Sequence, residues 1–251
     1  MVPARFTGRE SPALAALREV TRALGPLAER VVFIGGAIAP LLQSHPVSSA
    51  IRPTKDVDAV ARTTTYSDFD ALQNALRTHG FRNRGTMSDP TGHAHRWVSP
   101  GGVLFDLVPA GDHLGGSGNP WDQVAARRAI AIDLALGNEP PLIAHHSDAV
   151  SFLALKWAAY RDRGAGDLYA SHDIEDIFAV LASRPLLVQE CSAADATELR
   201  PAIAEMACAV FSNAADFGDL LAAHIVLAER QTARVVYREI RRVVRELVAL
   251  A

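Results

Sequence analysis

The chain has 251 residues, of which 49% are hydrophobic and 21% are charged, with a formal net charge of −3. This is ordinary globular composition, sufficient for one large domain or two smaller ones, and the negative charge gives no overall sign of nucleic-acid binding. No apolar run reaches the roughly 18 residues of a membrane span, and the first residues lack the apolar core of a secretion signal, so we expect a cytoplasmic protein with no membrane partner.

The first part of the chain mixes helix and strand signals. Ser11 followed by Pro12 is typical of a helix start, and Pro100-Gly101-Gly102 is typical of a tight turn between two strands. The elements predicted there are a helix to Leu24, a strand over 31–34, a helix over 37–42, a loop over 45–55, a strand over 56–61, a helix capped by Ser67 that runs to Leu76, strands around 81–84, 95–98 and 103–108, a loop over 111–120, and a strand near 129–135.

From Ser147 to the end, apolar residues recur at spacings of three and four, which predicts helices alone. Strands mixed with helices and then helices alone predict an α+β fold. We therefore expect one domain over residues 1–145 and a helical domain over 146–251. The cysteines, Cys191 and Cys208, are too few for a disulfide framework and are expected to be reduced.

Gly35-Gly36 stands between the strand predicted over 31–34 and the helix that follows it. A strand that turns sharply into a helix needs residues without a Cβ atom, and backbone N–H groups at such a turn can face a phosphate chain. The pair is therefore either a tight turn alone or a nucleotide-binding turn.

Three aspartates lie in otherwise apolar strands. Asp56 and Asp58 are two apart and share one strand face, and Asp106 interrupts the run Val103–Val108. If the two strands are neighbours, three carboxylates converge, and such unpaired charge is costly unless a cation offsets it. Hard oxygen ligands suit Mg²⁺. The alternatives are solvated aspartates on an edge strand and, for Asp106, a structural salt bridge.

The predicted helices beyond residue 147 carry a second charged group. Lys156 and Arg163 are seven apart and share a helix face, where they could grip phosphates or form an ordinary basic edge. Ser171 is a good N-cap, and Asp173 in the first turn is favoured by the helix dipole alone. Asp176 lies one turn further on and could form an ion pair with Lys156 or Arg163.

A row of arginines at spacings of three and four runs along the last predicted helix. It is either a solvated helix face or a surface for RNA or an acidic protein. Its members are Arg230, Arg234, Arg238, Arg241 and Arg245.

Together, Gly35-Gly36, Asp56-Val-Asp58 and Asp106 resemble the signature of the nucleotidyltransferase superfold, the group that includes DNA polymerase beta. That signature is a strand, Gly-Gly or Gly-Ser, a helix, Asp-x-Asp, and a third aspartate on a later strand. The stretch Arg52-Pro-Thr-Lys-Asp-Val-Asp, and Lys156 with Arg163 before the His-Asp-x-x-Asp-Ile helix, resemble the AbiEii-like branch. The chain departs from this branch at Ala37, where members often carry a hydroxyl residue, and at His172, where many carry lysine.

The resemblance implies a nucleotidyltransferase-like mixed sheet flanked by helices and an enzyme that transfers NMP from an NTP to an acceptor hydroxyl with release of pyrophosphate. The acceptor that it implies is an RNA end such as tRNA, a protein or a small molecule. Many members of the branch are toxins of toxin–antitoxin pairs, which implies a cognate antitoxin as partner. Two Mg²⁺ ions, or Mn²⁺, are the implied cofactors.

The resemblance also implies a role for each matching residue. Asp56, Asp58 and Asp106 would hold the metal ions, with Asp106 as the alternative general base. Lys156 would neutralise phosphate charge, and Gly35, Gly36, Arg163, Asp173 and Asp176 would bind or position the nucleotide.

Two other functions stay open. Small-molecule nucleotidylation of the antibiotic type needs an acidic acceptor pocket, which Asp112, Asp122 or Glu139 could supply. A non-catalytic nucleotide-binding regulatory protein would keep the fold without transfer.

His93 and His95 form a histidine pair without an evident third zinc ligand.

Overall fold

The computed structural model describes residues 3–8, 10–44, 54, 56–84, 95–111, 114–163, 167–212, 217–225 and 230–250. The chain divides into two compact units, the first formed by Met1–Leu41 and Pro53–Asp148 and the second by Leu42–Arg52 and Ala149–Ala251. The domains 1–145 and 146–251 stay a prediction. The predicted loop over 45–55 lies outside the described residues except at Thr54.

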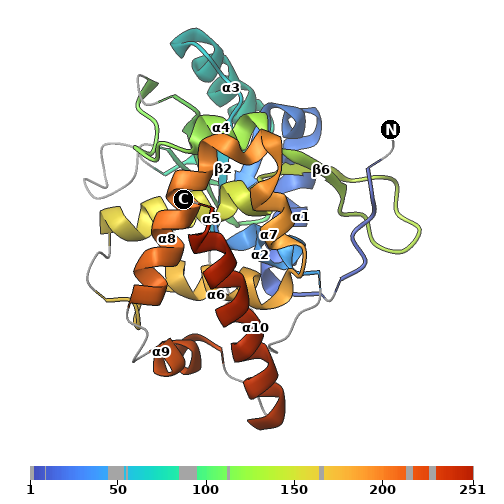
Figure 1. The fold of residues 1–251 in the computed structure, drawn as a ribbon. Helices are drawn as coiled ribbons and strands as arrows, with labels where there is room; N and C mark the ends of the chain where they lie inside the picture. Colours follow the sequence, from blue (N-terminus) through green and yellow to red (C-terminus); the bar gives the residue numbers. More distant parts are fainter. Residues whose placement is uncertain are drawn as a thin grey trace. The chain divides into compact units, whose positions relative to one another are not determined.

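The first unit contains a seven-stranded mixed sheet with helices beside it (Figure 1). Its elements are α1 (Pro12–Leu24), η1 (Gly25–Arg30), β1 (Val31–Ile34), η2 (Gly36–Ile38), the start of α2 (Ala39–Leu42), β2 (Asp56–Ala61), α3 (Tyr66–Thr78), β3 (Arg82–Asn83), β4 (Arg96–Val98), β5 (Leu104–Pro109), α4 (Asp122–Arg127), β6 (Ile130–Asp133) and β7 (Ile143–His146). An α+β fold is thus confirmed.

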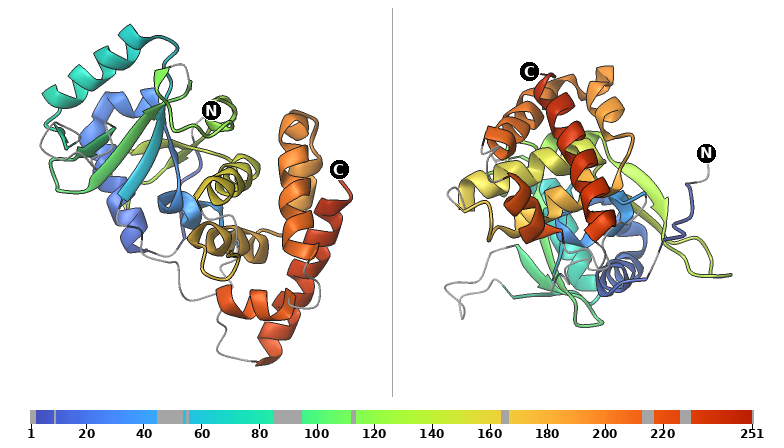
Figure 2. Two further views of the ribbon diagram at one scale, coloured as in Figure 1. Left: turned by 90° about the vertical axis from the view of Figure 1, so that its left-hand side faces the viewer. Right: turned by 60° about the horizontal axis from the view of Figure 1, so that its bottom comes forward.

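The strand order is β3-β4-β5-β2-β1-β7-β6. The central strand β2 pairs in parallel with β5 and antiparallel with β1, and β4 and β5 form an antiparallel hairpin. Figure 2, left, shows β2 in cyan and β5 in green as neighbouring arrows, with α1 and α4 on opposite sides of them. This places the two aspartate-bearing strands directly beside each other.

Side chains alternate along β5 as the sequence predicts. Phe105 and Leu107 are fully buried, whereas Leu104, Asp106 and Val108 lie on the other, partly open face. The Phe105 ring packs against Phe33 of β1 at a centroid distance of 6.5 Å. The aromatic core therefore fixes which face of the sheet the aspartate side chains occupy.

Several predicted boundaries need correction. The N-cap of α3 is Thr65, whose hydroxyl accepts from the N–H of Asp68 at 3.1 Å, so Ser67 lies inside the helix and is not its cap. The helix predicted over 37–42 begins as a 3-10 turn. The strand β7 was not predicted, because the run Ile143–His146 is too short to show a clear alternation.

The elements described in the second unit are helical: α5 (Ala149–Arg163), α6 (His172–Ser183), α7 (Leu187–Ser192), η4 (Ala194–Leu199), α8 (Arg200–Ser212), α9 (Phe217–His224) and α10 (Arg230–Val248). Helix α10 packs on α8 and α6, and α5 packs on α6 and α8. Ser171 caps α6 as predicted, with its hydroxyl accepting from the N–H of Ile174 at 3.4 Å.

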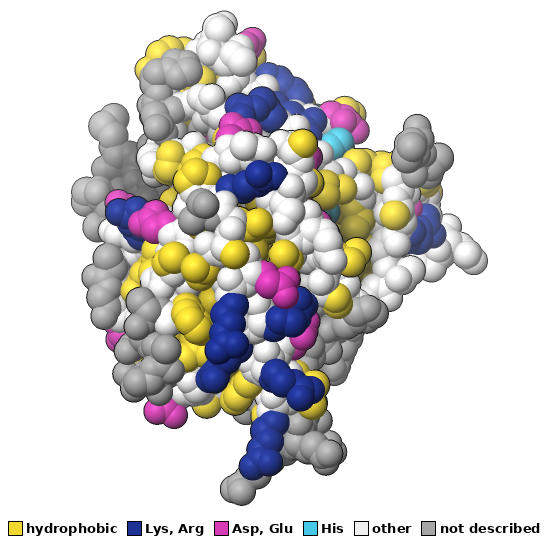
Figure 3. Space-filling model, in the orientation of Figure 1, with side chains coloured by type: hydrophobic (Ala, Val, Ile, Leu, Met, Phe, Trp, Pro, Cys, Tyr) yellow, Lys and Arg dark blue, Asp and Glu magenta, His cyan; other side chains and the backbone are white. Residues whose placement is uncertain are grey.

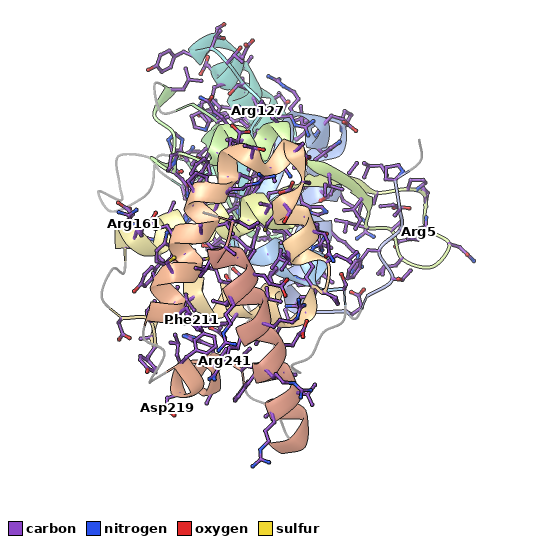
Figure 4. The ribbon with its side chains drawn as sticks, in the orientation of Figure 1. Arg5, Arg127, Arg161, Phe211, Asp219 and Arg241 are labelled. Atoms are coloured by element: carbon purple, nitrogen blue, oxygen red, sulfur yellow. The ribbon has the colours of Figure 1, made fainter. Side chains whose placement is uncertain are left out.

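The predicted arginine row lies on the exposed side of α10, where Arg234, Arg238, Arg241 and Arg245 reach solvent (Figure 3). Two of these guanidinium groups rest on phenylalanine rings: Arg241 lies 5.4 Å from the ring centroid of Phe217, and Arg245 lies 5.6 Å from that of Phe211. Figure 4 labels Arg241 on α10 and Phe211 on α8. The side chain of Arg230 is outside the described residues.

Of the helices in the described parts of the chain, none has both the length and the apolar character that a membrane span requires.

Candidate metal centre and a buried ion-pair network

Three carboxylates converge on one face of the sheet in the first unit. Asp58 of β2 lies directly opposite Asp106 of β5, and Asp56 is two residues before Asp58 on the same face. One carboxylate oxygen from each of these residues lies within 4.8 Å of the others. The convergence predicted for Asp56, Asp58 and Asp106 is therefore confirmed.

Gly35 makes room for the Asp58 carboxylate. It has φ +71° and ψ −168°, a conformation that is essentially restricted to glycine. A Cβ at this position would overlap Oδ2 of Asp58 and lie 2.9 Å from its Cγ. Gly36 is the first residue of η2, and it is not among the described glycines that have a positive φ. Phosphate binding by Gly35 and Gly36 stays a prediction.

Arg96, which the sequence reasoning missed, lies among the three carboxylates. Its Nε and Nη2 donate to Oδ1 and Oδ2 of Asp106 at 2.8 and 2.6 Å, and Nη2 also lies 3.4 Å from Oδ2 of Asp56. The hydrogen bond to Asp106 outweighs partial burial and raises the pKa of Arg96 above its ordinary value. Asp106 thus has the salt bridge that the sequence left open as an alternative to metal binding.

The position of Arg96 follows from a hairpin whose turn is held by α1. The Glu19 carboxylate accepts from the Ser99 hydroxyl at 2.7 Å and from the Gly101 N–H at 2.8 Å. With the turn fixed there, Arg96 pairs with Asp106 in the β4–β5 ladder. Gly101 lies midway between these two residues in the sequence, so the turn signal could have revealed the pair.

In the described part of the chain, the cluster brings three carboxylates together with the Arg96 guanidinium. The side chains of Asp56 and Asp106 are 33% and 20% exposed. The Thr54 hydroxyl adds a hydrogen bond to Oδ1 of Asp56 at 3.1 Å. A partly open set of three hard oxygen donors fits a divalent ion such as Mg²⁺.

The second unit contains a separate group of charged residues. Nζ of Lys156 on α5 lies 2.6 Å from Oδ2 of Asp176 and 3.1 Å from Oδ1 of Asp173, both on α6. Nη2 of Arg163 lies 3.1 Å from Oδ2 of Asp173. The structure therefore brings the four predicted residues of this unit together and confirms the ion pair between Asp176 and Lys156.

Charge in this group is balanced and mostly buried. The side chains of Lys156, Asp173 and Asp176 are only 10%, 12% and 9% exposed. Burial disfavours the lysine charge, but Asp176 and Asp173 outweigh it and raise the pKa of Lys156 above its ordinary value. Contact of these residues with a nucleotide stays a prediction.

Three of the residues considered for other sites have partners in the described part of the chain. Asp122 is buried and accepts from the Ser117 hydroxyl at 2.6 Å, and Glu139 pairs with Arg22 at 2.6 Å. Nε2 of His95 lies 2.8 Å from the carbonyl oxygen of Gly115. Asp112 and His93 are outside the described residues.

Comparison of the chain with family models, with curated proteins and with solved structures gave no match. The function is therefore argued from the residues and their geometry.

Proposed function

We propose that the protein is a metal-dependent nucleotidyltransferase, which moves NMP from an NTP to an acceptor hydroxyl and releases pyrophosphate. The observation that carries this proposal is the meeting of Asp56, Asp58 and Asp106 on adjacent parallel strands, with oxygen atoms within 4.8 Å of one another. Charged side chains on this face add nothing to the core of the sheet, so a cation-dependent role accounts for them better than packing does.

The three aspartates would hold Mg²⁺, and Gly35 keeps the space in which the Asp58 carboxylate lies. When bound, the metal would stabilise charge on the phosphates and acidify the attacking hydroxyl. Asp106 is the alternative acceptor for the hydroxyl proton. Both of its oxygens accept hydrogen bonds from Arg96, so the guanidinium competes with either role.

Lys156 and Arg163 are the proposed phosphate-binding cations. Lysine offers a compact charge and arginine a planar fork, both suited to phosphate oxygens. Each is already paired with Asp173, and Lys156 also with Asp176. Binding a nucleotide would therefore require these cations to exchange part of their carboxylate contacts for phosphate.

The test is transfer of label from each of the four NTPs to total RNA, to protein and to aminoglycoside-type small molecules, with and without Mg²⁺. We expect Mg²⁺-dependent labelling of one acceptor class, and a decrease of about 1,000-fold or more for Asp58→Asn, because the variant removes a metal ligand. Asp70→Asn, which changes an exposed carboxylate on α3, is the matched control and should keep full activity.

Equal labelling by the wild type and by an Asp56→Asn/Asp58→Asn double variant would refute the proposal, provided that circular dichroism shows both to be folded. Labelling of RNA, protein or the small molecule identifies the acceptor class. An RNA acceptor would also be the outcome expected of a toxin, whose activity a cognate antitoxin should suppress on co-expression.

One observation favours a second function, that of a nucleotide-binding regulatory protein without transfer. Arg96 already supplies a cation to Asp106 and Asp56, which lessens the need for a metal ion. Calorimetry distinguishes the two functions. Binding of an NTP without pyrophosphate release, across all three acceptor classes, would favour the regulatory function.

A further inference from the structure

The guanidinium of Arg96 is a positive charge that lies in direct contact with the carboxylate cluster. It bonds both oxygens of Asp106 and approaches Asp56, so one side chain contacts two of the three proposed metal ligands. The carboxylate oxygens that Arg96 contacts are therefore among those that a divalent ion would need as ligands.

We propose that Arg96 is an internal cation that competes with divalent ions for the carboxylate cluster, so that metal loading requires release of its guanidinium. This inference rests on the proposed function, because it concerns the same metal site. It goes further by assigning a role to a residue outside the three ligands.

The competition follows from the donor geometry. A planar arginine fork uses both oxygens of a carboxylate at once, which leaves fewer of its lone pairs for a metal ion and lowers the negative charge that would attract one. Close approach of two cations in a partly desolvated site is repulsive, since Coulomb energies rise as the effective dielectric constant falls. Arg96 and a metal ion therefore compete for Asp106 in its described arrangement.

Release of Arg96 needs only a side-chain movement. The strand β4 is held to β5 by backbone pairing of Arg96 with Asp106, Trp97 with Phe105 and Val98 with Leu104, which does not depend on the guanidinium. The Arg96 side chain is 30% exposed, so solvent is within its reach. The hairpin, its buried Trp97 and the turn held by Glu19 stay in place while the cation exchanges.

The experiment is calorimetric titration of Mn²⁺ into the full-length wild type, Arg96→Gln and Arg82→Gln. Arg82 is exposed on the neighbouring strand β3, so its substitution removes the same charge from the same sheet. We expect Arg96→Gln to bind Mn²⁺ about tenfold more tightly than the wild type. Arg82→Gln should change the affinity by less than about twofold.

Arg96→Lys provides a second variant that keeps the charge but loses the bidentate fork. Its Mn²⁺ affinity should fall between those of the wild type and Arg96→Gln. Thermal unfolding gives an independent readout. At the same Mn²⁺ concentration, the melting temperature of Arg96→Gln should rise by more than that of the wild type, because the stabilisation by a ligand grows with the logarithm of its concentration divided by its Kd.

Each outcome decides the matter. Tighter Mn²⁺ binding by Arg96→Gln without a similar gain in Arg82→Gln supports the competition, including the case in which only Arg96 variants bind. An equal gain in Arg82→Gln overturns the inference. Wild-type binding that Arg96→Gln leaves unchanged or weakens overturns this inference and leaves the proposed function intact. Absence of Mn²⁺ binding in every folded variant overturns both.

Discussion

The two charged groups differ in composition and in exposure. Among the described residues, the carboxylate cluster of the first unit brings three aspartates together with Arg96 and is partly open to solvent. The ion-pair network of the second unit sets Asp173 and Asp176 against Lys156 and Arg163, and three of its four side chains are largely buried. Balanced, buried charge is typical of an interaction that supports the fold, whereas several carboxylates that meet at a partly open site are typical of one that binds a ligand.

The largest effect on stability is expected at the buried network. Lys156→Met would leave Asp173 and Asp176 buried without their shared cation and should lower the free energy of unfolding by about 3–5 kcal/mol. Urea denaturation followed by circular dichroism measures the change. Arg161→Met, on the same helix, is the control: its pair with Glu205 is exposed and should contribute less than about 1 kcal/mol.

Equal costs for Lys156→Met and Arg161→Met would remove the distinction between the two groups, because Lys156 would then act as an ordinary surface cation. That result would also strengthen the proposed role of Lys156 as a phosphate ligand.

An intermediate effect is expected at Gly35. Gly35→Ala combines an unfavourable backbone conformation with a Cβ that overlaps the Asp58 carboxylate, and should cost about 1–3 kcal/mol while weakening Mn²⁺ binding. Gly102→Ala is the matched control, since Gly102 also has a positive φ, +89°, but no atom lies within 4 Å of an added Cβ.

Thermal melts and Mn²⁺ titrations of both glycine variants separate backbone strain from close approach. If Gly102→Ala weakens Mn²⁺ binding as much as Gly35→Ala does, the contact between Gly35 and Asp58 has no special role in the metal site.

The smallest effect on stability is expected for Asp58→Asn in metal-free protein. Asp58 faces Asp106 across neighbouring strands, and removal of one of two opposed like charges offsets the loss of other contacts. The free energy of unfolding of Asp58→Asn should therefore lie within about 1 kcal/mol of the wild-type value, and thermal melts measure the difference. A destabilisation as large as that of Lys156→Met would show that the carboxylate cluster is a structural network as well.

Local sequence signals predicted the parts of both groups that depend on short spacings. The period of two placed Asp56 and Asp58 on one strand face, and the helical period placed Lys156 and Arg163 on one helix face. The cap of α6 followed from Ser171 in the same way, whereas the cap of α3 did not, because Thr65 and Ser67 are both good caps and the choice depends on where the preceding strand ends. The short strand β7 also escaped, since four residues carry too little periodicity.

By itself, the sequence determined the acidic strands, the glycine turn, the helical second half and the resemblance that rests on them. Each of these features is predicted by residues that lie close together in the sequence. Only the tertiary structure decided that Arg96 joins Asp106 and that Lys156 is neutralised by Asp173 and Asp176. Such pairs depend on strand register and helix packing between separate segments, which are set by the burial of the whole core rather than by any local pattern.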